Sequence, residues 1–375
     1  MKVIFWFSVA FLLFAYVGYP IGMYFLARFR ARPVRKAPVL PSVTLVLAAR
    51  NEEKHIERKL RNLEVLDYPE RKLDLIVVSD GSTDRTNSIL AVSESPRLRR
   101  LILPEHQGKA AALNQAVSQA RGEIVVFCDA RQTIARDALK NLVANFADPA
   151  VGCVSGQLMM GSARVSDNLD GIGLYWECEK RIRNWESVSG STIGATGALF
   201  AIRRNLFSPL PEGTILDDVY IPLQIALLGR RVVFEPRAVA WDEPAATLQL
   251  EFRRKVRTLA GNYQLLRLAP WLLSRSNPLR FRFVCHKLLR LVAPAILLML
   301  FVSAFWIREG WYELALYGQL FFYVLAGLRP VTARVGWLAR VSSIPLAFVV
   351  LNAAAVLAFF YFVTGRKLGW TRQAT

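Results

Sequence analysis

Residues 3–26 form an apolar run without a charged side chain, and this run limits the possible folds more than any other feature. A helix needs roughly 20 apolar residues to cross a bilayer core, and the run has that length. A cleaved signal peptide is the alternative, but the run is long for one, only Lys2 precedes it, and arginines follow it. Three more apolar runs lie at residues 288–307, 314–328 and 344–363. We therefore expect one membrane helix before the globular part of the chain and about three after it.

Basic residues are concentrated next to the apolar runs. The chain has 48 Lys and Arg against 29 Asp and Glu, a net charge of +19. Residues 28–36 and 252–290 contain Arg and Lys but no Asp or Glu. Such clusters fit the anionic headgroups of the cytoplasmic leaflet, and the positive-inside rule places the chain after the first run in the cytoplasm. No nucleic-acid recognition motif accompanies the charge, so we expect membrane lipids and not nucleic acid as partners.

The topology of the other end stays open at this stage. If all four runs cross the membrane, residues 366–375 lie outside the cell. Those residues include Arg366, Lys367 and Arg372, and the positive-inside rule favours the cytoplasm for them. One of the later runs is then re-entrant or buried in protein, or the tail is an exception to the rule.

Between residues 41 and 244, short apolar runs alternate with amphipathic helical periods. The runs at 43–49, 75–79 and 124–128 are rich in β-branched residues and continuously apolar, as buried parallel strands are. Strand–helix alternation predicts an α/β domain with a mostly parallel sheet. Ligands of such sheets bind beyond the carboxyl ends of the strands, which is where the polar motifs of this chain begin.

The stretch after residue 245 has the pattern of a basic amphipathic helix. Arg254 and Arg257 share one face, and apolar residues recur on another. This pattern predicts an interfacial helix that lies on the membrane with its apolar face in lipid. The apolar positions are Phe252, Val256, Leu259, Tyr263 and Leu266.

Five short motifs hold the polar residues at the predicted strand ends. They are Ala-Arg-Asn-Glu-Glu (49–53), Ser-Asp-Gly-Ser-Thr-Asp (79–84), Gln-Gly-Lys-Ala-Ala-Ala-Leu-Asn (107–114), Cys-Asp-Ala-Arg (128–131) and Leu-Asp-Asp (216–218). In this order they resemble family 2 glycosyltransferases, which have the GT-A fold and include cellulose, hyaluronan and poly-N-acetylglucosamine synthases. The resemblance covers residues 43–257. It implies transfer of a sugar from a nucleotide sugar, such as a UDP-sugar, to a glycan or lipid-linked acceptor.

Together these patterns divide the chain into five expected parts. The resemblance implies a multi-pass protein of the cell inner membrane whose catalytic domain is cytoplasmic. The parts are a membrane helix at 1–28, a GT-A catalytic domain at 29–245, a basic interfacial helix region at 246–285, about three membrane helices at 286–365 and a basic tail at 366–375.

Glu52 and Asp80 are the first two candidate donor-binding residues. The resemblance implies that Glu52 contacts the base or ribose of the nucleotide, and that Asp80 accepts hydrogen bonds from the uracil or ribose. Each residue also has a purely structural interpretation. Glu52 can be a solvated loop acid, and Asp80 can belong to a turn that caps the next helix.

Lys109 and the motif Asp129-Ala-Arg131 are candidates for binding the diphosphate. Lys109 follows Gly108 at the start of a predicted helix, where the dipole is already positive, so an anion should lie nearby. Asp129 and Arg131 stand where the family has Asp-X-Asp, a motif that binds a divalent ion through hard oxygen ligands. Arg131 replaces the second acid and can pair with phosphate itself. Asp129 can then bind the ribose or a single Mg²⁺ or Mn²⁺ ion, and we expect a weaker metal requirement than in the rest of the family. In the structural alternative, Asp129 and Arg131 form a surface ion pair.

Asp218 is the candidate catalytic residue. Asp217-Asp218 begins a helix predicted over residues 219–228, and a structural interpretation makes the pair an N-cap and a first-turn acid. The resemblance makes Asp218 the general base that deprotonates the acceptor hydroxyl in an inverting transfer. Two adjacent acids also raise each other's pKa, which suits a base that works near neutrality.

Arg254 and Arg257 lie where processive members of the family have Gln-X-X-Arg-Trp. Arg257 matches the arginine, Arg254 replaces the glutamine and Thr258 replaces the tryptophan. We expect Arg257 to reach the diphosphate, although a solvated basic helix is the alternative. Without the tryptophan the acceptor sugar lacks a flat stacking surface, which argues against long-chain polymerisation.

Two other functions compete with the single-addition transferase. One is a processive exopolysaccharide synthase with its own translocation channel, in which Trp185 or Trp241 replaces the missing stacking surface. The other is a non-catalytic nucleotide-sugar-binding subunit, for which Arg131 and Ser79 are the support, since family members often have acids at both places. Product length separates the first rival from the transferase, and Asp218-dependent transfer excludes the second.

Overall fold

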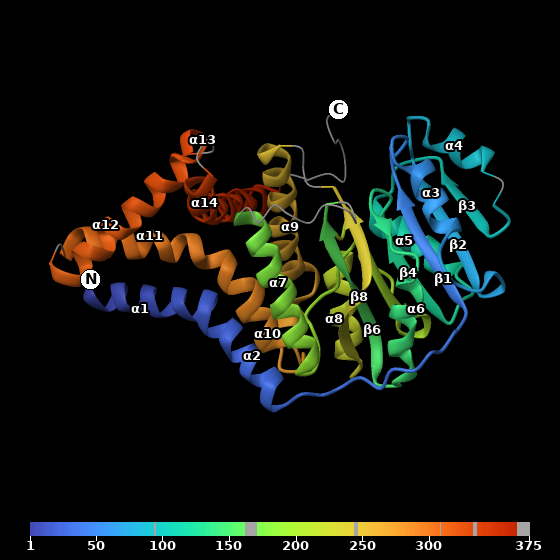
Figure 1. Ribbon diagram of the computed structural model, residues 1–375, viewed down its shortest axis with the longest axis horizontal. Helices are drawn as coiled ribbons and strands as arrows, with labels where there is room; N and C mark the ends of the chain where they lie inside the picture. Colours follow the sequence, from blue (N-terminus) through green and yellow to red (C-terminus); the bar gives the residue numbers. More distant parts are fainter. Residues whose placement is uncertain (94, 162–170, 244–246, 308, 333–335, 366–375) are drawn as a thin grey trace.

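A computed structural model describes residues 1–93, 95–161, 171–243, 247–307, 309–332 and 336–365. Figure 1 shows an α/β part built around a sheet on one side and long apolar helices on the other, with α7, α9 and α10 between them. The expected basic tail at 366–375 and the expected boundary at 245–246 fall outside the described residues.

An eight-stranded mixed sheet forms the centre of the α/β part, with the strand order β3-β2-β1-β4-β7-β6-β8-β5. The first four strands are parallel, whereas β7 is antiparallel to both of its neighbours, β4 and β6. Beyond it, β8 is parallel to β6 and antiparallel to β5. The strands are β1 (Val43–Ala49), β2 (Leu73–Asp80), β3 (Leu98–Leu103), β4 (Ile124–Cys128), β5 (Thr133–Ile134), β6 (Val151–Met160), β7 (Leu199–Arg203) and β8 (Arg231–Asp242).

Helices cover both faces of the sheet and continue into the apolar part. Two π-helical turns, η1 (Phe14–Gly18) and η6 (Val284–Leu288), lie within long helices of that part. The α-helices are α1 (Lys2–Leu13), α2 (Tyr19–Phe29), α3 (Ile56–Glu64), α4 (Thr86–Val92), α5 (Lys109–Ser118), α6 (Ala138–Val143), α7 (Gly171–Val188), α8 (Asp217–Leu227), α9 (Leu248–Leu268), α10 (Arg280–Phe283), α11 (Leu289–Ile307), α12 (Gly310–Gly327), α13 (Arg329–Thr332) and α14 (Gly336–Val363).

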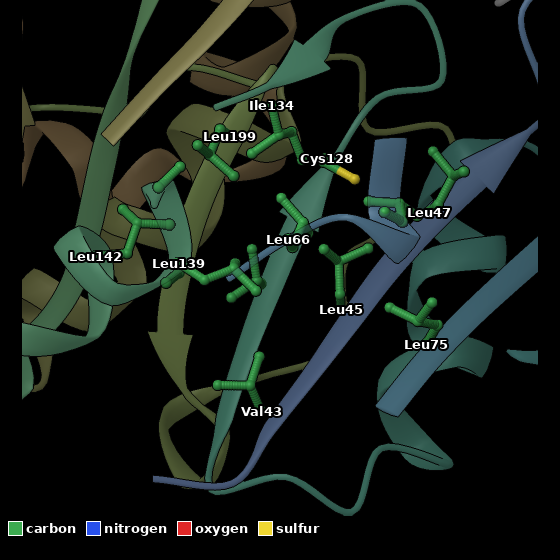
Figure 2. Packing of buried hydrophobic residues seen from close by; sticks show 14 of the residues in the cluster. Val43, Leu45, Leu47, Leu66, Leu75, Cys128, Ile134, Leu139, Leu142 and Leu199 are labelled. Atoms are coloured by element: carbon green, nitrogen blue, oxygen red, sulfur yellow. The ribbon is translucent and has the colours of Figure 1, made fainter. Parts of the chain in front are cut away.

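The core consists of two layers, one on each face of the sheet. Side chains alternate along a strand, so Leu45 of β1 points to one face and Val46 to the other. The first layer contains residues of α3 and α6, and Figure 2 shows Leu139 and Leu142 of α6 within it. The second contains residues of α5 and α8. All seven residues of β1 are therefore buried, as predicted for a parallel strand covered on both faces.

The predicted strands and their polar ends are confirmed. The expected strands at 43–49 and 124–128 coincide with β1 and β4, and the one at 75–79 lies inside β2. Because β1, β2 and β4 are parallel, their carboxyl ends meet at one edge of the sheet. The motifs that follow these strands are thus brought together by the fold.

Three helical segments are long and apolar enough to cross a membrane. They are Lys2–Phe29 and Arg280–Ile307, with 28 residues each, and Val341–Val363, with 23 residues. At about 1.5 Å per residue, each exceeds a hydrocarbon core of about 30 Å. The remaining apolar run, at 314–328, coincides with α12 up to Gly327. This helix contains Glu313 and Gln319, and it is not one of the three candidate spans.

The apolar face of the predicted basic helix packs against another helix, and its interfacial position on a membrane stays a prediction. The helix exists as α9, but Val256 and Ala260 are buried against Ala354 and Ala358 of α14. Phe252, Leu259 and Tyr263 pack around the same contact. An apolar stripe looks the same in the sequence whether lipid or a second helix covers it, and the covering helix lies far along the chain.

We predict that Ala358→Leu destabilises the protein through the contact between α9 and α14. Ala358 is fully buried in that contact, and extra methyl groups in a packed site cost about 1–3 kcal/mol. The melting temperature in detergent should fall by several degrees. Val356→Leu is the matched control, because Val356 lies on the same helix and is 43% exposed. Equal melting temperatures for the two variants would contradict the contact.

Candidate functional site

Lys109 lies at the centre of a group of acids at the carboxyl edge of the sheet. It is the first residue of α5, and its Nζ lies 3.1 Å from an oxygen of Asp129 and 3.1 Å from an oxygen of Asp217. Burial acts to lower the pKa of Lys109, but the carboxylates of Asp129 and Asp217 outweigh it and raise the pKa above its ordinary value. The anion expected beside this helix start is thus provided in part by the chain itself.

Asp218 lies in the first turn of α8, beside Asp217 and one residue further from the helix start. One of its carboxylate oxygens accepts a hydrogen bond of 3.0 Å from the backbone N–H of Gly197. Burial, and then the charge of Asp217, raise the pKa of Asp218 to about 6, although Lys109 acts to lower it. The predicted effect of adjacent acids is present, but burial is the larger cause.

Gly197 allows Asp218 and Asp129 to approach the same backbone segment. A Cβ atom at this position would lie 3.3 Å from an oxygen of Asp218 and 3.7 Å from an oxygen of Asp129. The N–H of Gly197 is a part of the site that the motifs of the sequence do not predict. The run of small residues before β7 is the sequence feature that could have indicated it, because small residues leave room for the side chains of Asp218 and Asp129.

Glu52 is partly buried next to Asp129. Burial, and then the charge of Asp129, raise the pKa of Glu52 to about 7, with Arg131 acting to lower it. Its backbone N–H donates to the hydroxyl of Thr86, over 2.8 Å. Glu52 therefore belongs to the same acidic group as Asp129.

Asp80 is fully buried and holds the loop that leads to Lys109. Its carboxylate accepts hydrogen bonds from the backbone N–H groups of Gln107 (2.7 Å) and Gly108 (2.9 Å) and contacts Nδ1 of His106 (2.7 Å). Gly81 follows with a φ of 58°, and a side chain there would collide with the backbone of His106. Asp80 thus holds the loop before Lys109, and its predicted contact with the nucleotide stays a prediction.

Arg131 forms a salt bridge with Asp242, an acid that none of the predicted motifs contains. Nε of Arg131 donates to one oxygen of Asp242 over 2.8 Å, and its terminal nitrogen donates to the other over 2.5 Å. Asp242 is buried at the end of β8 and also accepts a hydrogen bond from Gln132. Its position directly after an apolar strand, like that of Asp129, is the signal that could have revealed it.

Arg254 and Arg257 lie on α9 at the side of this group. Burial, and then the charge of Arg131, lower the pKa of Arg254 from its ordinary value. Arg257 is exposed, one turn further along the helix. Arg254 is thus half-buried and feels the charges of Arg131 and Asp242, whereas Arg257 faces solvent.

The residues present do not build a divalent metal site by themselves. Asp129 is the only acid of its motif, and one of its oxygens already faces Lys109. Throughout the part of the chain that the structure describes, no three His, Cys, Asp or Glu side chains are grouped so as to hold a metal ion. Within Asp129-Ala-Arg131 itself, a hard cation such as Mg²⁺ would find a single carboxylate, which also pairs with Lys109.

Known proteins share the sequence pattern of the α/β part and the fold of the whole chain. Residues 44–210 match the sequence model of glycosyl transferase family 2. The probable glycosyltransferase YdaM of Bacillus subtilis is 28% identical over 237 residues, which is 60% of this chain and 56% of that protein. The poly-β-1,6-N-acetyl-D-glucosamine synthase of Staphylococcus aureus is 28% identical over 239 residues, with the same shares. The chain thus matches little more than half the length of these relatives.

A solved structure extends the likeness to the apolar helices. The mannosyltransferase PcManGT of Pyrobaculum calidifontis, in complex with GDP-Man and Mn²⁺, superposes with a TM-score of 0.71 at 24% identity. The match covers 97% of this chain and 100% of that one. The two chains therefore share their fold, a GT-A-type α/β domain with apolar helices attached.

We predict that Asp218→Asn stabilises the fold at pH 7.5. The fold raises the pKa of Asp218 from 3.8 to about 6, so the native state favours the neutral acid. The stability that comes from this preference is present below about pH 4 and is lost as the pH rises through about 6. Asparagine is neutral at every pH, so the variant should melt at a higher temperature than the wild type at pH 7.5 but not at pH 4. An equal advantage at both pH values would show that the buried charge is not the cause.

Proposed function

We propose that this chain, which belongs to family 2 of the glycosyltransferases, is a membrane-anchored inverting transferase with Asp218 as its general base. The observation that carries the proposal is the environment of Asp218. It is half-buried near Lys109 and Asp129, its pKa is raised to about 6, and one carboxylate oxygen accepts a hydrogen bond from the N–H of Gly197. A base is most effective when its pKa lies near the working pH.

In the proposed reaction, Asp218 takes the proton of an acceptor hydroxyl. The hydroxyl oxygen forms a bond to the anomeric carbon of the donor sugar, on the face opposite the nucleoside diphosphate. The bond from that carbon to the phosphate oxygen breaks at the same time, and the diphosphate leaves with the electron pair. The proton remains on Asp218 until solvent removes it, which a carboxyl of pKa about 6 permits at neutral pH.

Lys109, Arg254 and Arg257 are the proposed partners of the diphosphate. Preorganised cations that face developing negative charge stabilise a transition state. Lys109 lies at the amino end of α5, where the helix dipole adds positive potential. We propose that Glu52 and Asp129 bind the ribose side of the donor and that Asp80 acts through the loop before Lys109. A uridine donor follows from the resemblance of the first two motifs, and the guanosine donor of the Pyrobaculum structure is the one to test against it.

Three membrane crossings fit the charge pattern of the chain. With the α/β part in the cytoplasm after Lys2–Phe29, the segment Arg280–Ile307 crosses outward and Val341–Val363 crosses back. The basic residues of 366–375 then lie in the cytoplasm, as the positive-inside rule favours. We propose this topology in the inner membrane, with α12 packed against α11 and α14 without crossing. The exposed Arg253 of α9 would face anionic headgroups.

Single addition to a glycan or lipid-linked acceptor is the form of transfer that we favour. Trp185 packs against Tyr24 with ring centroids 5.4 Å apart, at the contact between α7 and α2, so it is not available to stack on an acceptor sugar. Trp241 lies on β8 next to Asp242 and remains the candidate for a processive enzyme. Transfer that depends on Asp218 would exclude a non-catalytic subunit.

Asp218→Asn should lose roughly 10²–10⁴-fold in transfer rate, the range for removal of a general base. Donor binding, measured as a thermal shift with UDP-sugars and GDP-sugars, should survive because Asp218 faces the acceptor. Asp67→Asn is the control, since Asp67 is an exposed acid that pairs with Lys140. Wild-type transfer by the Asp218 variant would end the assignment of the base.

We also predict that the enzyme keeps transfer activity in EDTA, within about tenfold of its rate with Mg²⁺, because Lys109 and Arg254 already supply positive charge. Arg131→Asp should create strong metal dependence, since it removes the partner of Asp242 and adds a third acid beside Asp129. Arg121→Asp is the control, because Arg121 is exposed before the amino end of β4. Complete loss of wild-type activity in EDTA, restored by Mn²⁺, would contradict the prediction.

A further inference from the structure

The loop between α7 and β7 is the backbone partner of the proposed base. Its Gly197 N–H donates to the carboxylate of Asp218, and its Ala195 N–H donates to the backbone carbonyl of Asp218 over 2.7 Å. The N–H of Thr196 donates to the hydroxyl of Ser155 on β6, over 3.0 Å. The position of Asp218 therefore depends on how this loop is held.

Arg282 of α10 holds the beginning of the same loop from the membrane side. One guanidinium nitrogen donates to the carbonyls of Glu186 and Ser191, over 2.5 Å each. The other donates to the carbonyl and the hydroxyl of Ser189, over 3.3 and 2.9 Å. A guanidinium has five N–H donors in a fixed plane, so these contacts fix the direction in which the loop leaves α7. Arg282 belongs to Arg280–Ile307, one of the candidate membrane spans.

Glu186 is a second link between the membrane helices and the loop. It is fully buried near the end of α7, and one carboxylate oxygen accepts a hydrogen bond of 3.1 Å from the hydroxyl of Thr192. Its other oxygen lies 2.8 Å from Nδ1 of His286 in η6 and accepts a hydrogen bond from Tyr19 of α2. Two separate membrane helices thus meet at the carboxylate that binds the loop.

The cluster around Glu186 continues to a second buried acid. Nε2 of His286 lies 3.1 Å from Glu179 of α7, and Glu179 also pairs with Arg290. Removing one partner from a buried charged network leaves the other charge uncompensated, so such networks tolerate few arrangements. None of these residues is among those to which we assign a role in donor binding or proton transfer. The cluster is therefore free to serve a positioning role.

We propose that Glu186, Thr192 and Arg282 are positioning residues through which the membrane helices set the place of the catalytic base. The inference rests on the proposed function of Asp218 and adds the groups that hold it. The chain of contacts runs from Tyr19 and His286 to Glu186, then to Thr192, along the loop to Gly197, and ends at the carboxylate of Asp218. Disturbing any link should displace the base without removing it.

Thr192→Val tests the proposal because it removes the hydroxyl that donates to Glu186 over 3.1 Å and lies 3.4 Å from the carbonyl of Gly194 in the same loop. We expect kcat to fall roughly 10- to 100-fold, as for a displaced catalytic group, with the donor KM changed less than about twofold. The acid limb of the kcat–pH profile should also move to higher pH, because the N–H of Gly197 favours the ionised carboxylate. The other charged groups around Asp218 are Asp217, Lys109, Asp129 and Lys287, and the substitution touches none of them.

Two further variants control for a merely structural effect. Thr192→Ser keeps the hydroxyl and should keep the wild-type profile. Thr44→Val removes a buried hydroxyl that accepts from two backbone N–H groups at the opposite edge of the sheet, so it should lower stability and leave the profile unchanged. If Thr192→Val does not fold, Arg282→Lys gives the same readout, since lysine retains the charge but not the planar set of donors.

A wild-type kcat and pH profile in Thr192→Val, or in Arg282→Lys where the first variant does not fold, overturns the positioning role. Asp218→Asn separates this failure from that of the proposed function. If that variant is inactive while Thr192→Val behaves as the wild type, the base assignment stands and only the positioning role fails. If Asp218→Asn is fully active, the proposed function itself fails.

Discussion

The salt bridges of Lys109 with Asp129 and Asp217 connect three elements that the fold brings to one edge of the sheet. Asp129 follows β4, Lys109 begins α5 and Asp217 begins α8, so a single half-buried cation joins a strand end to two helix starts. One lysine cannot compensate all the acids around it. The excess negative charge adds to the effect of burial on Asp218 and on Glu52, whose pKa values are raised to about 6 and about 7. The raised pKa values of Asp218 and Glu52 thus follow from burial together with more carboxylates than cations around them.

Arg131 acts against the raised pKa of Glu52, but its hydrogen bonds go to Asp242. The guanidinium of Arg131 donates two hydrogen bonds to the buried carboxylate of Asp242 at the neighbouring strand end. Gln132 donates to the same carboxylate. The residue that replaces the second acid of Asp-X-Asp is therefore neither a metal ligand nor a free cation in this structure. It bridges the first and second halves of the sheet, since Asp242 ends β8 and Arg131 follows β4.

The sequence predicts those parts of the site that depend on local pattern. The apolar runs at 43–49 and 124–128 are strands, so Glu52 and Asp129 fall at strand ends as expected. The remaining contacts join residues that lie far apart in the chain. Arg131 and Asp242 are separated by 111 positions, and Glu186 and His286 by 100. The burial of Asp80 could not be predicted for a similar reason, because His106, in the loop that covers it, lies 26 residues further along the chain. Periodicity shows which residues are buried, but it does not show which partner buries them.

The boundaries expected near residues 245 and 285 cut across the contacts that hold the site together. Glu186 and Glu179 belong to α7, yet His286, Arg290 and Tyr19, which bind them, all come from helices long and apolar enough to span a membrane. Without those helices, two buried carboxylates would lose their compensating partners, a change that typically costs about 3–5 kcal/mol for a buried pair. The apolar face of α9 would lose α14 at the same time. The α/β part and the apolar helices therefore form one structural unit, in which anchoring the chain and orienting its proposed base depend on the same residues.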